Sequence, residues 1–184
     1  MMDDTRTDAD LVRCFIDGDD DAFGILVDRY QRTVFNAAYR LMGNVASAKD
    51  VSQSVFLKVF EKLESFDDRL SFYSWLYRIT VNEALNALKR DNRRQTLDDI
   101  AAVASAGPGP EESMAAVETG RHVQEALMRL KPEYRTVVVC RHILSMSYSE
   151  IAEITQLPEK TVKSRLFTAR ELLRGWLTEK GVVR

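Results

Sequence analysis

The side chains best suited to chemistry lie near the C-terminus, where basic, hydroxyl and aromatic groups share one face of a predicted helix over 159–179. At about 100° per residue, the inner stripe of this helix consists of Val162, Leu166, Ala169 and Leu173. Phe167 points the other way, among residues that are mostly polar. An aromatic ring there can contact a thymine methyl in the DNA major groove; the alternative is that it packs under a neighbouring helix. The pattern predicts binding to duplex DNA.

The segment before this helix has the features of the first half of a helix-turn-helix. Ser147 and Glu150 are spaced as a capping box, in which each side chain satisfies a free amide at the helix start. Ala152 is small enough to let two helices cross closely. Leu157 then occupies the turn, and Pro158 can serve as the first residue of the second helix.

No catalytic or metal-binding arrangement competes with this interpretation. His122 and His142 lie far apart, without cysteines at metal-ligand spacing, which argues against a zinc site. Cys14 and Cys140 lie in apolar helical patterns and are expected to be reduced packing residues. The sequence has no glycine loop of the kind that cradles phosphates. We therefore expect no enzyme activity, no metal, no cofactor and no small-molecule substrate.

The chain has 184 residues, of which 45% are apolar, and this suits one or two compact domains. No apolar run approaches the roughly 18 residues of a membrane span. The first ten residues are acidic and lack the pattern of a secretory signal. These features predict a cytoplasmic protein with no membrane partner.

The formal net charge of −2 hides blocks of alternating sign. Nine acids and two bases give −7 over 1–28, and five acids without a base give −5 over 95–120. Twelve bases and seven acids give +5 over each of the two remaining blocks, 29–94 and 121–184. Nucleic-acid binding depends on local positive potential, so each basic block is a candidate for it.

Hydrophobic periodicity predicts helices throughout and no convincing strand. Four helices are expected in the first basic unit, at about 8–17, 20–42, 46–63 and 72–91. The third has an apolar stripe of Val51, Val55, Val59 and Leu63, which Phe56 and Phe60 are expected to widen. Small residues with Gly and Pro over 101–110 indicate a linker. The fold class is therefore all-α, with two small helical domains at 1–94 and 113–184 and a flexible acidic linker at 95–112.

Three stretches resemble, in order and spacing, the extracytoplasmic-function (ECF) sigma factors, minimal members of the sigma-70 family of bacterial RNA polymerase. These stretches are GDDDAFGILVDRY at 18–30, SFYSWLYRITVN at 71–82 and YSEIAEITQLPEKTVKSRLFTAR at 148–170. The resemblance extends from Ala9 to about Trp176. It implies a first domain like sigma region 2 and a second, helix-turn-helix domain like region 4.

The resemblance also implies roles for individual residues. In the first domain, the loop from Phe66 to Ser71 and Asn82 would hold an unpaired base of the promoter −10 element, between amide groups and aromatic walls. The residues expected to follow the phosphates near the melted strand are Asn86, Lys89, Arg90, Arg93 and Arg94. Those expected to read the −35 element are Thr161, Lys163, Ser164, Phe167 and Thr168, with support from Arg165 and Arg170.

The third helix would dock on core RNA polymerase through Ser47, Lys49, Asp50, Gln53 and Ser54. Three acids that are usual in the family are replaced here by Ser47, Lys49 and Ser54, and only Asp50 remains. Lost charges at such an interface weaken docking. Phosphorylation of Ser54 or Ser47, or of Ser52 on another face, would add about −1.5 to −2 charges. We therefore expect either activation by a Ser/Thr kinase or tolerated drift with control by an anti-sigma factor.

The sequence as a whole predicts a transcription initiation factor that binds core RNA polymerase and promoter DNA, and that reaches the nucleoid through the polymerase. Two alternatives remain. One is an autonomous helix-turn-helix regulator, although no dimerisation helix is evident in the sequence. The other is a sigma mimic that captures an anti-sigma factor without promoting initiation.

Overall fold

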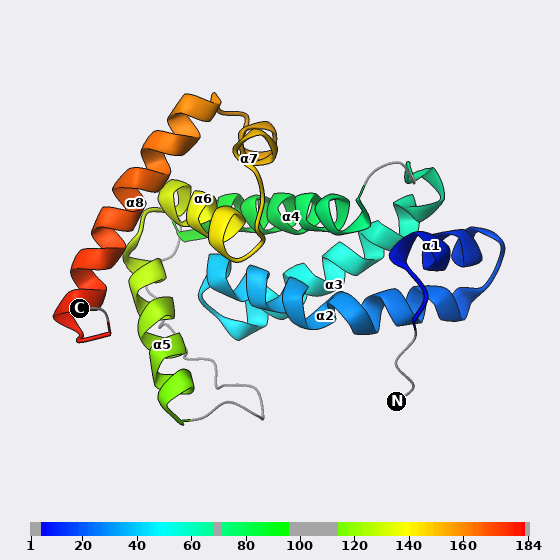
Figure 1. The fold of residues 1–184 in the computed structure, drawn as a ribbon, viewed down its shortest axis with the longest axis horizontal. Helices are drawn as coiled ribbons and strands as arrows, with labels where there is room; N and C mark the ends of the chain where they lie inside the picture. The colour runs from blue at the N-terminus through cyan, green and yellow to red at the C-terminus, as the bar shows by residue number, and fades with distance from the viewer. Residues whose placement is uncertain (1–4, 68–70, 96–113, 183–184) are drawn as a thin grey trace.

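The computed structural model describes residues 5–67, 71–95 and 114–182, with side chains for 5–67, 71–91 and 118–182. In these parts of the chain all regular structure is helical, as predicted (Figure 1). The helices are α1 (Asp8–Ile16), α2 (Asp20–Met42), α3 (Val45–Lys62), η1 (Leu63–Ser65, a short 3₁₀ turn), α4 (Phe72–Gln95), α5 (Met114–Arg129), α6 (Pro132–His142), α7 (Tyr148–Thr155) and α8 (Glu159–Glu179).

The N-terminal half, α1 to α4, packs around α2, which contacts each of the other three helices. The apolar stripe predicted for α3 is buried, and its members are Val51, Val55, Val59 and Leu63. Phe60 lies beside this stripe and is 50% exposed, so it is not a core residue, but its ring centre lies 5.4 Å from that of Phe15 on α1 and 5.2 Å from that of Phe23 on α2. Phe56 is half-buried and packs against the core.

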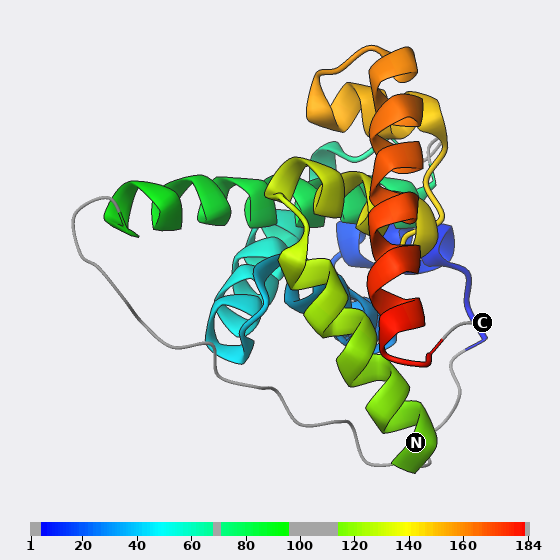
Figure 2. The same ribbon diagram turned by 90° about the vertical axis from the view of Figure 1, so that its left-hand side faces the viewer.

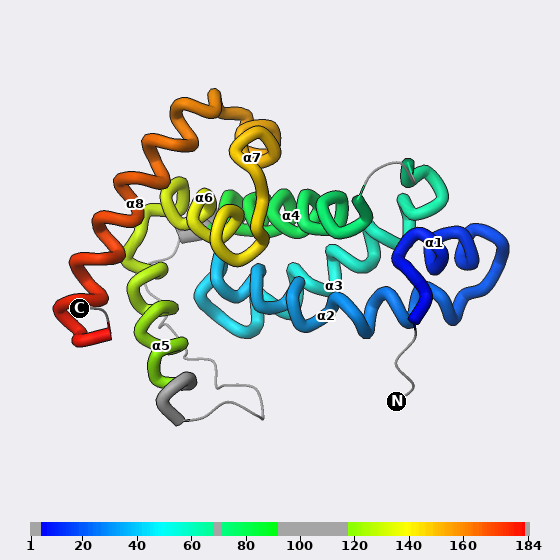
Figure 3. The backbone as a smooth tube through the Cα atoms, in the orientation of Figure 1, coloured from blue at the N-terminus to red at the C-terminus, as the bar shows by residue number. Residues whose placement is uncertain are grey.

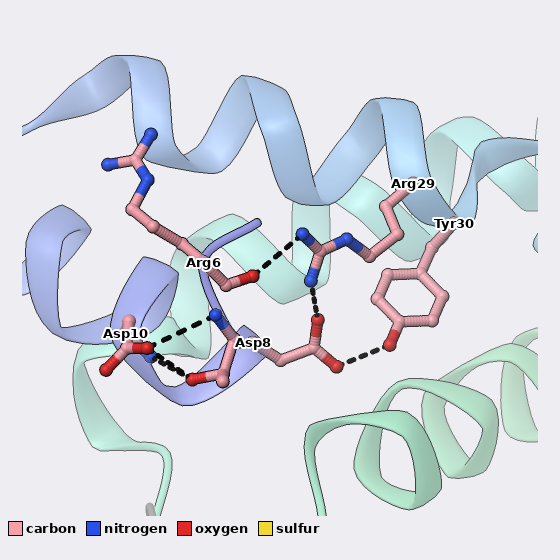
Figure 4. A network of polar contacts seen from close by, with 6 residues as sticks. Arg6, Asp8, Asp10, Arg29 and Tyr30 are labelled. Atoms are coloured by element: carbon pink, nitrogen blue, oxygen red, sulfur yellow. Dashed lines mark hydrogen bonds and ion pairs between the residues drawn. The ribbon is translucent and has the colours of Figure 1, made fainter. Parts of the chain in front are cut away.

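A polar network holds α1 on α2 (Figure 4). The Asp8 carboxylate accepts hydrogen bonds from Arg29 and from the Tyr30 hydroxyl, both on α2. Burial and the Asp8 carboxylate raise the pKa of Tyr30 above its usual value. Thr7 and Asp10 form a capping box, which gives hydrogen-bond partners to backbone amides at the start of α1.

The C-terminal half, α5 to α8, contains the predicted helix-turn-helix. Ser147 and Glu150 form the capping box at the start of α7. The turn passes through Gln156 in a left-handed conformation (φ +54°), and Leu157 follows it. The expectation that Pro158 is the first residue of this helix is wrong by one position, because Pro158 is the N-cap and α8 begins at Glu159. The ψ of Pro158 is extended at 143°, which keeps it outside the helix.

The two halves pack against each other and share one apolar core (Figures 1 and 2). Helix α2 contacts α5 and α6, and α4 contacts α7. The backbone trace shows α7 beside α4, with α8 running from there to the C-terminus near α5 (Figure 3). The linker predicted at 95–112 lies outside the described residues, apart from the backbone of Gln95 at the end of α4.

Candidate nucleic-acid interface

The outer face of α8 is open to solvent. Phe167 is 70% exposed, whereas its neighbour Leu166 is 1% exposed. The alternative in which Phe167 packs under another helix is therefore not what the structure shows. The other residues predicted for this face are exposed at Lys163, Ser164, Thr168 and Arg170, and half-buried at Thr161 and Arg165. An exposed phenylalanine among hydroxyl and cationic groups matches what a major groove offers, which is methyl groups, polar base edges and phosphates.

Three contacts orient two cations on this face. The Lys163 ammonium lies 5.2 Å from the centre of the Tyr148 ring and 3.4 Å from the Glu159 carboxylate. The Arg170 Nε lies 3.1 Å from the His142 Nε2 of α6. Burial, with Arg170 and Arg141 nearby, lowers the pKa of His142. A neutral imidazole is thus favoured, and it can accept a hydrogen bond from Arg170.

A second polar surface runs along one side of α4. At 100° per residue, Ser71, Arg78, Asn82, Asn86 and Lys89 fall within about 80° of one another, and we call this set the α4 stripe. Ser71, Asn82, Asn86 and Lys89 are exposed, as their predicted role requires. Sequence reasoning missed Arg78, although its spacing of four residues from Asn82 was the available signal.

The remaining residues predicted for the −10 element lie in different surroundings. Phe66 is half-buried, with its ring centre 4.9 Å from that of Trp75 and 5.9 Å from that of Phe72. Arg90 is exposed and lines a groove between α3 and α4. The backbone of α4 includes Arg93 and Arg94, whose side chains lie outside the described residues.

The residues predicted to dock on polymerase divide between two surfaces of α3. Ser47, Asp50 and Ser54 line the groove of about 230 Å³ between α3 and α4. The other residues that line it are Val51, Glu83, Ala87, Arg90 and Asp91. Asp50, Glu83 and Asp91 outnumber Arg90 in this lining, although Glu83 forms an ion pair with Lys58. Helix α4 thus supplies carboxylates next to the positions where α3 lacks them.

Lys49 and Gln53 lie on the outer side of α3 and are exposed. Sequence reasoning missed two apolar side chains on this same side, Leu57 at 65% exposed and Phe60 at 50% exposed. The i, i+4 spacing from Lys49 through Gln53 to Leu57 was the available signal. An exposed apolar pair on a helix is typical of a surface that another protein covers.

Neither thiol takes part in these surfaces. Cys140 is buried, and burial raises its pKa to about 12, which keeps the thiol protonated and unreactive. Within the described residues, no three His, Cys, Asp or Glu side chains gather as a metal site would require. None of the described helices combines the length and apolar character needed to cross a bilayer.

Comparisons with known proteins match both halves of the chain. Residues 26–94 match Sigma-70 region 2, and residues 121–173 match Sigma-70, region 4. The ECF RNA polymerase sigma factor SigW of Bacillus subtilis is 33% identical over 172 residues, covering 88% of this chain and 92% of the relative. The ECF RNA polymerase sigma-E factor of Haemophilus influenzae is 36% identical over 179 residues, covering 92% and 94%.

A solved structure of CnrH in complex with the cytosolic domain of CnrY has a TM-score of 0.64 and 27% identity, and covers 94% of this chain and 97% of that one. The similarity to sigma factors thus extends over nearly the whole chain, and the two family matches fall on the halves that carry the α4 and α8 surfaces. The chain belongs to the ECF sigma factors of the sigma-70 family, which are transcription initiation factors of bacterial RNA polymerase.

Proposed function

We propose that the C-terminal half, 113–184, reads the −35 element through the outer face of α8. The observation that carries this proposal is the 70% exposed Phe167 on the second helix of a helix-turn-helix. Ser164 and Thr168 flank it with hydroxyls that can reach base edges, and Lys163 supplies a charge for phosphate. Arg165 and Arg170 support the face from its sides, and Thr161 lies near the helix N-terminus, where a DNA phosphate is favoured.

The N-terminal half, 1–94, in this proposal docks on core polymerase and recognises the −10 element. The α4 stripe lies against the unpaired strand, with Asn82 and the Phe66 to Ser71 loop holding one flipped base. Stacking needs an accessible ring, and the half-buried Phe66 is the candidate for this role. Asn86 and Lys89, with Arg90, Arg93 and Arg94 beyond them, extend the surface along the phosphates.

Docking on polymerase uses α3. Its exposed Leu57 and Phe60 supply apolar area, and Lys49 and Gln53 lie beside them. The acidic groove with Asp50, Ser47 and Ser54 borders this surface. Cytoplasmic location follows from partnership with RNA polymerase and promoter DNA, and the protein acts in this proposal without catalytic chemistry or a cofactor of its own.

A modification switch on α3 is the regulatory part of the proposal. Ser47 and Ser54 line an open groove, so a kinase can reach them, and a phosphate there adds about −1.5 to −2 charges to an already acidic surface. Ser52 is the weakest of the three candidates, because it does not line the groove and its Oγ donates a hydrogen bond to the Ala48 carbonyl at 2.7 Å. The competing control is an anti-sigma factor; in support of protein control, the similar CnrH binds the cytosolic domain of CnrY.

Affinity for purified core RNA polymerase tests the docking through α3 and the modification switch. The chain is compared with a Lys49→Glu/Ser54→Glu variant, which supplies acids on both surfaces of α3. A Thr178→Glu/Lys180→Glu variant is the matched control, because it makes the same kinds of substitution at exposed positions near the C-terminus. We expect the α3 variant to bind at least about tenfold tighter, equivalent to about 1.4 kcal/mol, and the control to bind like the original chain.

Equal and tight binding by all three chains would overturn the switch and leave an anti-sigma factor as the means of control. No binding by any of them would overturn the proposed docking on core polymerase and favour an autonomous regulator. Tight binding without initiation from any promoter would instead indicate a sigma mimic.

A further inference from the structure

Aromatic side chains form a continuous row from α2 to the beginning of α4. The Tyr30 ring of α2 packs on Phe72 of α4, with 5.6 Å between the ring centres. Phe72 is buried, and its ring centre lies 5.9 Å from that of Phe66 and 5.8 Å from that of Trp75. These separations fall within the range of about 4.5–7 Å that packed aromatic pairs favour. We call these four side chains the aromatic row.

The end of the row formed by Phe66 and Trp75 is partly exposed. Both residues are half-buried, and their ring centres are 4.9 Å apart. A nucleic-acid base stacks on an accessible aromatic face, so the proposed function places the unpaired base at this end. The side chains of Phe66 and Phe72 carry no polar atom, so their positions depend on the rings packed against them.

Polar contacts with α1 fix the Tyr30 end of the row (Figure 4). The Tyr30 hydroxyl donates a hydrogen bond to one oxygen of the Asp8 carboxylate, and Arg29 donates to the other. Arg29 also donates to the Arg6 carbonyl at 3.0 Å. The Asp8 side chain is 25% exposed, and partial burial strengthens charge-assisted bonds of this kind. Since both of its oxygens are engaged, the carboxylate presents a fixed acceptor to Tyr30.

This polar network determines orientation more than it adds stability. Replacement of a buried ion pair by apolar groups of similar volume is often neutral for folding, because the attraction is offset by the cost of desolvation. A hydrogen bond to a fixed acceptor is directional and weakens steeply when it bends. The hydroxyl lies at the far end of the Tyr30 ring, so its bond to Asp8 fixes the direction in which the ring points toward Phe72.

We propose that Asp8 is a positioning residue for base recognition, which acts through the Tyr30 hydroxyl to hold the aromatic row and thereby the Phe66 and Trp75 rings on which the unpaired base of the −10 element stacks. This inference rests on the proposed function of Phe66. Neither Asp8 nor Tyr30 touches DNA in it. Helix α1 thus contributes to promoter recognition although it carries none of the residues expected to contact DNA.

The test compares two single-stranded probes of about 12 nucleotides, one of random sequence and one with an abasic backbone, on the full chain. Both probes carry the same phosphates, so the ratio of their affinities reports the contribution of the bases. A role of Asp8 in folding alone would leave this ratio unchanged in the folded protein. A positioning role lowers it.

Two variants interrupt the contact, and each has a matched control. Tyr30→Phe removes only the hydroxyl, and Tyr134→Phe removes one from a half-buried tyrosine of α6. Asp8→Ala removes the carboxylate, and Asp17→Ala removes an exposed carboxylate at the other end of α1. The second pair matches the change in net charge, which by itself alters the attraction of phosphates.

A second readout reports the row without DNA. The chain has two tryptophans, so a Trp176→Phe background leaves Trp75 as the only source of tryptophan fluorescence. Acrylamide quenching then measures how well the neighbouring rings shield Trp75. We expect Tyr30→Phe and Asp8→Ala to raise this quenching and the two control variants to leave it unchanged.

The original chain is expected to bind the random-sequence probe at least about tenfold tighter than the abasic probe. Tyr30→Phe and Asp8→Ala are expected to lower this ratio at least about threefold, with affinity for the abasic probe equal to that of the matched control. The control variants keep the ratio of the original chain. If Asp8→Ala loses helicity, the decision rests on Tyr30→Phe.

An original ratio in both contact variants would overturn the inference, and so would greater quenching of Trp75 without a lower ratio. Failure of the proposed function gives a different result, in which the original chain itself does not distinguish the two probes. The base site at Phe66 would then be wrong, and the inference that rests on it would be overturned as well.

Discussion

Phe167 and Leu166 are neighbours in sequence with opposite surroundings. Leu166 lies in the core between α8 and the rest of the C-terminal half, and Phe167 lies almost wholly in solvent. Exposure of a large aromatic ring adds nothing to folding, because the ring buries little area. Its contribution is therefore expected in binding, whereas that of Leu166 is expected in stability.

Replacement of Phe167 by Ala is expected to leave the free energy of unfolding within about 0.5 kcal/mol of the original value. Promoter binding by the holoenzyme is expected to weaken about fivefold, since one apolar base contact is lost. Leu166→Ala is expected to cost about 2–5 kcal/mol of stability, because it leaves a cavity in the core. Urea unfolding and promoter binding, measured on both variants, check these two predictions. Equal loss of stability by Phe167→Ala would show that the ring packs against protein in solution.

Periodicity predicted these exposures correctly because it reports the direction of each side chain around a helix. It does not report what lies opposite that side chain. Phe60 was expected in the core because it neighbours an apolar stripe, and Arg78 was overlooked because its partner, Glu153, is 75 residues away in sequence. Leu57 was likewise left out of the docking surface. Each omission concerns a residue whose surroundings depend on tertiary contacts.

At the scale of elements, α7 depends on its first turn, because eight residues are too few for a stable isolated helix. The Ser147 side chain accepts a hydrogen bond from the Glu150 backbone N–H, and the Glu150 carboxylate accepts one from the Ser147 backbone N–H at 2.8 Å. These bonds satisfy amides at the helix start that would otherwise lack partners.

Ser147→Ala is expected to lower the free energy of unfolding by about 1 kcal/mol at pH 7, because it removes one half of the capping box. Ser164→Ala is the control, because it changes an exposed serine of α8, away from the start of α7. Urea denaturation of both variants checks the difference. Equal losses at the two serines would argue that the cap does not limit the stability of α7.

The capping box also predicts a pH dependence. Hydrogen bonds from Ser147 hold the pKa of Glu150 below its usual value. A carboxylate with a lowered folded-state pKa contributes stability that is present above its unfolded value, near 4.3, and is lost as the pH falls through the folded value. The stability difference between the original chain and Glu150→Gln is therefore expected to shrink between pH 6 and pH 3. A constant difference in urea titrations over that range would contradict this.

Helix boundaries followed closely from sequence wherever a cap or a glycine marks them. The predicted 20–42 and 159–179 agree with α2 and α8, which end near Gly43 and Gly181. The sequence was less informative over 113–146, where it did not separate α5 from α6. The β-branched run Thr136 to Val139 is buried on all sides, and an all-apolar segment has no period from which to read a face.

At the scale of the whole molecule, the packing of the two halves was not predicted. Arg135, Gln124 and Arg40 join the two halves through hydrogen bonds to main-chain carbonyls, and such bonds leave no complementary residue pattern in the sequence. Gly43 shows how closely the halves approach. It ends α2 with φ of +83°, and a Cβ placed on it would lie 2.3 Å from the Met128 Sδ of α5.

Gly43→Ala is accordingly expected to destabilise the closed chain by about 1–3 kcal/mol, from backbone strain and from collision with Met128. In a double-mutant cycle, Met128→Ala should relieve the collision, so the pair loses less stability than the sum of the two single changes. Gly175→Ala is the control with the opposite sign, because a Cβ there meets no atom within 4 Å and alanine favours the helix. Thermal unfolding of the four variants gives the coupling, and strict additivity would show that the halves do not touch at Gly43.

The side-chain donors that join the two halves have a consequence for how such chains diversify, and they are Arg40, Gln124 and Arg135. Main-chain oxygens are present whatever side chain a position carries, so the acceptors at Tyr39, Leu41 and Gly120 impose no requirement on those residues. A recombined gene that joins this N-terminal half to a foreign C-terminal half would still close, provided that the incoming half brings an arginine and a glutamine equivalent to Arg135 and Gln124. C-terminal halves with new promoter preferences can thus be exchanged while the hydrogen bonds that hold the two halves together are kept.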